Sequence, residues 1–193
     1  RSQVPLAAAT TGIADRYPCG KPTDRVPGAY LPAADVDLLV SRFDEVATRL
    51  AGGLRVPGKA EVPVCADQAC SDGTRTFTLD PSLRRVHLLA LPPRSKAGLR
   101  LDGPRGSANV TGAGTYDVGG AKAVVKAVAG RGLSVDIDRP EDLAGWNGGW
   151  KVAMVDPAAK AAVKGGLLEV FVYSDLGVAL AQPTVLTRGT TSK

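Results

Sequence analysis

The sequence contains a single histidine, His87, and few aromatic residues: two Trp, four Tyr and three Phe. His87 is therefore the only histidine available as a general base, and it sits inside an alternating run between Arg85 and Leu89. The sequence also lacks the Gly-x-Ser-x-Gly motif of serine hydrolases and the Gly-Lys-Ser/Thr ending of a phosphate-binding loop. We therefore expect that the chain is not an enzyme and needs no cofactor.

Long apolar runs are absent too, since none approaches the roughly 20 residues of a transmembrane helix. The formal net charge of +5 is spread along the chain, whereas nucleic-acid surfaces concentrate their basic residues, so we expect no nucleic-acid partner. The chain begins with Arg1 and has no signal peptide, which suggests a processed piece of a longer protein. Its richness in Ala, Arg and Gly suggests a bacterial source.

Cysteine is scarce, with three residues in the whole sequence. Cys65 and Cys70 have the spacing of a small loop closed by a disulfide, which favours an oxidising compartment and a secreted or cell-surface protein. Free thiols or a metal site are the alternatives, and a zinc site would need more ligands than His87 supplies. Cys19 pairs outside this chain or stays free.

One amphipathic helix is predicted, over residues 35–51, after an irregular proline-containing segment. Asp35 is a suitable N-cap, and Gly52 and Gly53 end the pattern. The apolar stripe repeats at helical spacing through Val36, Leu39, Val40, Phe43, Val46, Ala47 and Leu50. We expect this stripe to be buried. The opposite face, which we expect to be solvated, carries Arg42, Asp44, Glu45 and Arg49.

After Gly53 the pattern changes to short apolar or alternating runs bounded by Gly, Pro, Asp or Asn. The runs are Thr74–Leu79, Arg84–Leu91, Leu99–Leu101, Lys122–Val128, Leu133–Asp138, Trp150–Val155, Leu167–Tyr173 and Thr184–Thr187. About eight strands without intervening helices predict a mainly β fold, an antiparallel immunoglobulin-like β-sandwich over residues 54–193. We expect residues 1–53, an irregular segment plus the helix, to form a separate unit, and Gly112–Gly120 and Lys160–Gly166 to be mobile loops.

Acidic residues cluster at Asp136, Asp138, Glu141 and Asp142. Asp136 and Asp138 share one face of a predicted strand, and the four carboxylates together could bind Ca²⁺. The competing interpretation is a solvent-facing strand that runs into an acidic loop.

Both tryptophans lie in one short segment, Trp146-Asn-Gly-Gly-Trp150. Trp150 alternates in phase with Val152 and Met154, which predicts that it faces the core. Trp146 precedes the turn, and with Asn147 it could either cover the end of the sandwich or contact a carbohydrate or cell-wall ligand.

The order of motifs resembles a β-sandwich module that follows a von Willebrand factor A domain in secreted and surface proteins. The segments are TRTFTLDPSLRRVHLLAL, LRLDGPRG, LSVDID, GWKVAMVDP and LLEVFVYSDL. The matching positions are Phe77, Asp80, Ser82, Leu83, Pro104, Gly106, Trp150, Asp156 and Pro157. The helix at Val36–Leu50 then resembles the last helix of the A domain. The metal-binding Asp-x-Ser-x-Ser loop of A domains is missing from this chain.

This resemblance implies a non-catalytic structural or adhesive module. Its partner would be another protein or an upstream domain of the same chain.

Overall fold

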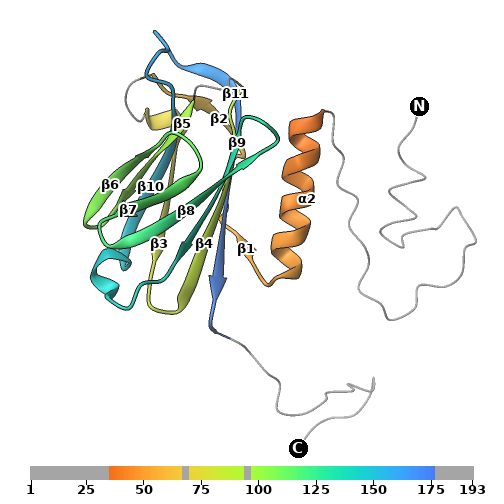
Figure 1. The fold of residues 1–193 in the computed structure, drawn as a ribbon. Coiled ribbons are helices and arrows are strands. Elements are labelled where there is room, and N and C mark those ends of the chain that lie inside the picture. The colour runs from red at the N-terminus through yellow and green to blue at the C-terminus, as the bar shows by residue number, and fades with distance from the viewer. Residues whose placement is uncertain (1–34, 67–69, 94–96, 177–193) are drawn as a thin grey trace, which may run out of the picture.

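The computed structural model describes residues 35–66, 70–93 and 97–176. Within them, eleven strands form two packed sheets. One α-helix stands against the outer face of the larger sheet (Figure 1). Every strand ladder is antiparallel. The prediction of a mainly β sandwich with one helix on its N-terminal side is therefore confirmed.

The larger sheet, sheet A, contains the long strand β11 next to one of its edges. Its order is β1 (Leu54–Arg55), β11 (Val163–Ser174), β4 (Leu83–Leu91), β9 (Gly132–Asp138), β8 (Ala121–Val128) and β7 (Gly114–Val118). Strand β2 (Glu61–Val64) also pairs with β11. Sheet B has the order β3 (Thr74–Leu79), β10 (Gly148–Val155), β5 (Gly98–Gly103) and β6 (Gly106–Val110).

Each strand predicted on described residues is present, whereas the predicted strand Thr184–Thr187 lies outside them. The predicted loop Gly112–Gly120 is wrong, because β7 occupies Gly114–Val118 and pairs with β8. Its Val118 is buried, and the hairpin turns through Gly119 and Gly120, both at positive φ. The predicted connection Lys160–Gly166 is wrong in part, since β11 begins at Val163.

The main core lies between the two sheets and is apolar. Alternate residues point inward, as Val86 and Leu88 do on β4 and as Val152 and Met154 do on β10. The prediction that Trp150 faces the core is confirmed, because its side chain is 1% exposed and stacks near Phe77.

Helix α2 (Val36–Leu50) has the predicted bounds. The carboxylate of Asp35 accepts a hydrogen bond from the Leu38 amide at 2.8 Å, and the helix ends before Gly52 at positive φ. Its buried residues, however, are polar: Ser41, Glu45 and Thr48.

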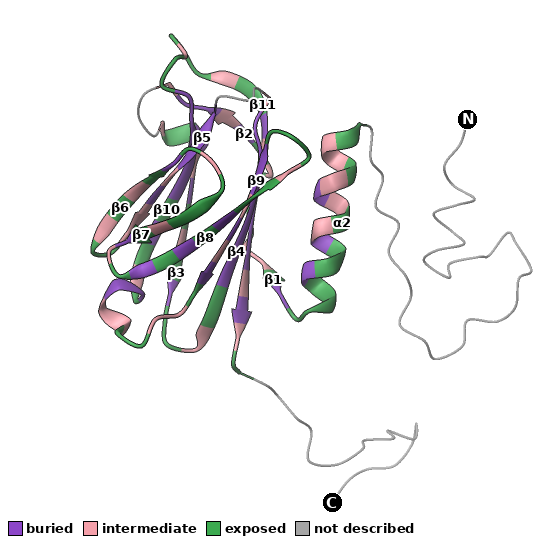
Figure 2. Cartoon of the chain, in the orientation of Figure 1, coloured by how far each residue is buried: buried purple, intermediate pink, exposed green. Residues whose placement is uncertain are grey.

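The orientation of α2 is therefore opposite to the prediction. Val36, Phe43 and Leu50 are 70%, 69% and 85% exposed, and the outward side of α2 is largely exposed (Figure 2). The physical reason is the chemistry of the outer face of sheet A, which presents His87, Arg55 and Glu169 to the helix. Polar groups on the sheet need polar partners, so the polar face of the helix packs there.

Candidate functional site

The predicted carbohydrate contact is not supported at Trp146. This side chain has no exposed surface, its indole N–H donates to the Asp80 carbonyl at 3.1 Å, and its own carbonyl accepts from Trp150 Nε1 at 2.8 Å. The two indoles meet edge to face with centroids 6.2 Å apart. Because a sugar needs an exposed ring to stack on, the burial of Trp146 favours the alternative that it covers the end of the sandwich. Asn147 beside it is exposed.

The acidic residues considered as Ca²⁺ ligands do not converge on one point. Asp136 contacts His87 at 2.9 Å, Asp138 pairs with Arg85 at 2.6 Å and Asp142 pairs with Arg105 at 3.3 Å. Glu141 is exposed. The described ranges hold no group of three or more His, Cys, Asp or Glu side chains arranged to bind a metal ion.

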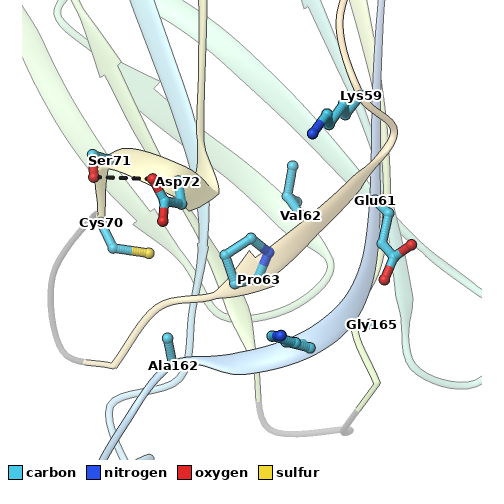
Figure 3. Close-up of a pocket in the computed structure, with 10 residues that line it drawn as sticks. Lys59, Glu61, Val62, Pro63, Cys70, Ser71, Asp72, Ala162 and Gly165 are labelled. Atoms are coloured by element: carbon cyan, nitrogen blue, oxygen red, sulfur yellow. Dashed lines mark hydrogen bonds between the residues drawn. The ribbon is translucent and has the colours of Figure 1, made fainter.

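The predicted disulfide between Cys65 and Cys70 is present, with an S–S distance of 2.09 Å. Beside it lies an open hollow of about 480 Å³, which the sequence did not reveal (Figure 3). Its walls come from β2, the 3₁₀ turn Ser71–Gly73 and the start of β11. Lys59 and Lys164 line it together with Glu61 and Asp72, so its charge is mixed, and the Ser71 hydroxyl in its wall donates to Asp72 at 3.4 Å.

The most organised polar site lies in the seam between α2 and sheet A. At its centre, His87 on β4 is opposite Asp136 on β9 and Phe171 on β11. Nδ1 of His87 is 2.9 Å from a carboxylate oxygen of Asp136, and Nε2 is 3.1 Å from both carboxylate oxygens of Asp44 on α2. The histidine therefore bridges the sheet and the helix.

The surroundings determine the charge of His87. Burial lowers the pKa of the imidazole, but the hydrogen bonds to Asp136 and Asp44, together with their charges, outweigh burial and raise that pKa to about 9. The hydrogen bond from His87 correspondingly lowers the pKa of Asp136. With both ring nitrogens engaged, His87 is not free to act as a general base.

Two further charged groups are buried in the seam. Glu169 on β11 is 2% exposed and pairs with Arg55 on β1 at 3.1 Å. Burial raises the pKa of Glu169, and the nearby Arg55 opposes that rise. On the helix, Glu45 is also 2% exposed and pairs with Arg42 at 2.8 Å and Arg49 at 2.6 Å. The prediction that Glu45 lies on a solvated face is thus wrong.

Beyond the C-terminal end of α2, the connection between β1 and β2 is also held in place. Arg75 on β3, 9% exposed, donates hydrogen bonds to the carbonyls of Val56, Pro57 and Lys59. At the other end of the helix, Arg131 pairs with Asp37. The ion pair holds the first turn of α2 to the β8–β9 connection, and Arg75 ties the β1–β2 connection to sheet B.

One signal in the sequence points to this seam. Polar residues alternate with buried apolar ones on the central strands: Arg85 and His87 on β4, and Asp136 and Asp138 on β9. Such alternation places the polar residues on one outer face. The register that puts His87 opposite Asp136 was needed to recognise that they interact.

Comparisons with known proteins give little. No family model matches the chain, and no curated protein matches it. Among solved structures, the chain is similar to the CspB protease of Clostridium perfringens, with 11% identity and a TM-score of 0.38. The match covers 78% of this chain and 40% of the protease chain, so this chain spans less than half of that protein's length.

Proposed function

We propose that this chain is a non-catalytic, extracellular protein-interaction module, and that the outward stripe of α2 is its contact surface. The outward stripe consists of Val36, Leu39, Phe43, Val46 and Leu50. One observation carries the proposal: the polar face of α2 is fixed to sheet A while the outward stripe stays exposed. Contiguous exposed apolar surface of this kind is typical of interaction sites.

The size of the outward stripe favours an attached partner over a free one. Its side chains are between 41% and 85% exposed. Burying them would remove roughly 500–600 Å² from water, against about 800 Å² per partner in stable complexes. A partner in the same polypeptide needs less contact area, because the linker keeps it at an effective concentration in the millimolar range.

The partner we propose is a von Willebrand A-like domain on the N-terminal side of α2 in the same polypeptide. The motif order described above and the position of α2 before the sandwich support this choice. The Cys65–Cys70 disulfide supports an extracellular location. In the part of the chain that the structure describes, no helix is long and apolar enough to cross a membrane.

The test begins with the natural reading frame, in which we expect an Asp-x-Ser-x-Ser loop upstream. Both the longer polypeptide and the present chain would then be followed by hydrogen exchange across Val36–Leu50. We expect exchange of the α2 amides to slow at least about tenfold in the longer polypeptide, because docking stabilises the helix. Phe43→Glu should remove that protection, whereas Lys151→Glu, an exposed control on β10, should retain it.

Equal exchange rates of α2 in the two polypeptides would overturn the proposed contact. An upstream sequence without an Asp-x-Ser-x-Ser loop would overturn the identification of the partner as an A-like domain.

A further inference from the structure

We propose that His87 is a positioning residue that clamps α2 to sheet A by bridging Asp44 and Asp136, and thereby sets the direction of the outward stripe. The inference rests on the proposed function for the role of the stripe. The clamp itself depends only on contacts inside this chain.

The geometry fits a doubly protonated ring when both carboxylates are ionised. An ionised carboxylate can only accept hydrogen bonds, and His87 has carboxylate oxygens within 3.1 Å of both ring nitrogens. A neutral imidazole has one N–H and could satisfy only one of the two partners. The imidazolium donates to both, so one positive charge neutralises part of the negative charge on the helix and on the sheet.

His87 is the side chain that contacts both of these carboxylates. The groups that face it are Asp44 from α2, Asp136 from β9 and Phe171 from β11, while Arg85 on β4 and Lys126 on β8 lie near Asp136 and help to lower its pKa. Arg85 is engaged with Asp138 at 2.6 Å, and Phe171 is uncharged with its ring centroid 6.2 Å away. Without the imidazolium charge, Asp44 and Asp136 would repel each other across the seam.

The sign of the pH dependence follows from the raised pKa of His87. A group whose pKa is higher in the folded state stabilises that state fully below its unfolded pKa of 6.5. The contribution is lost as the pH rises through about 9, where the folded imidazole loses its proton. The clamp is therefore closed at neutral pH, and raising the pH into the alkaline range opens it.

The test is direct, because the chain has one histidine and all histidine ring signals in its NMR spectra therefore come from His87. We would titrate the ring C–H resonance of His87 in the chain of residues 1–193. The expected midpoint is near pH 9. Asp44→Asn and Asp136→Asn should each lower it by about 1 pH unit or more, because each removes an opposite charge in direct contact.

Asp138→Asn is the matched control, since Asp138 lies on the same strand and face but pairs with Arg85. It should move the midpoint by much less than either partner substitution. His87→Gln, which keeps one donor, should speed hydrogen exchange of the α2 amides about tenfold while the β8 and β9 amides stay protected.

A midpoint near pH 6.5 would overturn the clamp, as would a midpoint that Asp44→Asn leaves unchanged. Both measurements use the chain without a partner. They can therefore fail while the proposed contact with an A-like domain stands, and the reverse also holds.

Discussion

The two faces of sheet A are packed by different chemistry. The inner face meets sheet B through apolar side chains, with Leu88 and Val170 fully buried. The outer face meets α2 through Glu45, Glu169 and the His87 bridge. Apolar packing is favourable with any close neighbour, whereas a charged seam is favourable only while every buried charge keeps its partner.

This difference explains why α2 exposes apolar surface. A helix that packs through its apolar stripe has that apolar surface buried, so it is not available to a second partner. Here the polar face attaches α2 to the sandwich, so the outward stripe remains available. Substitutions that weaken each face of sheet A separately test this difference in packing.

The largest expected effect is on the inner face. Trp150→Ala should lower the free energy of unfolding by about 3–5 kcal/mol, because it empties a fully buried site and removes the contact with Trp146. Denaturant unfolding measures this change. Lys151→Ala, on the exposed side of the same strand, is the control and should change stability by less than about 0.5 kcal/mol. Similar losses for both would mean that Trp150 is not in the core.

Alkali should act on the outer face alone. Raising the pH from about 6 to about 10 should cost up to roughly 3 kcal/mol in the attachment of α2, because the stabilisation by His87 is lost through its folded pKa of about 9. Hydrogen exchange, corrected for its intrinsic pH dependence, can separate α2 from strands β8 and β9. His87→Gln should remove this dependence. A uniform loss of protection in helix and strands would contradict the distinction between the two faces.

A smaller loss is expected from an unpaired charge in the seam. Arg55→Met should destabilise the chain by about 2 kcal/mol, because Glu169 stays buried without its partner. Adding Glu169→Leu to that variant should recover most of the loss, since the buried charge is then gone. Thermal unfolding of the single and double variants checks both statements. A double variant less stable than the single one would show that the ion pair itself stabilises the seam.

The smallest effect on stability is expected at the outward stripe. Leu50→Glu should change the free energy of unfolding of the isolated chain by less than about 0.5 kcal/mol, because the side chain is 85% exposed. A loss of several kcal/mol, measured by denaturant unfolding, would mean that Leu50 is covered within this chain.

Sequence reasoning located most of the fold because its signals were local. The bounds of α2 follow from Asp35 and Gly52, and the burial of Trp150 follows from its alternation with Val152 and Met154. The orientation of α2 could not be predicted in this way. Amphipathic spacing identifies residues that share a face, but the packed face depends on which surface lies beside it.

The missed strands have a similar cause. Strand β2 contains Pro63, which interrupts a strand pattern yet is tolerated here because β2 pairs on one side only, with β11. The His87 bridge needed a long-range register between β4 and β9, which a single sequence does not reveal.

The hydrogen bonds from Arg75 to the connection between β1 and β2 have a mechanical consequence. A pull applied at Asp35 travels first through the seam of α2 and then through β1, whose ladder with β11 has two residue pairs. It next reaches the carbonyls of Val56, Pro57 and Lys59, which Arg75 ties to β3 in the other sheet. Tension from a neighbouring domain would therefore detach α2, and then β1, before it acts on the rest of the sandwich. The detachment would stop at the connection that Arg75 holds to β3.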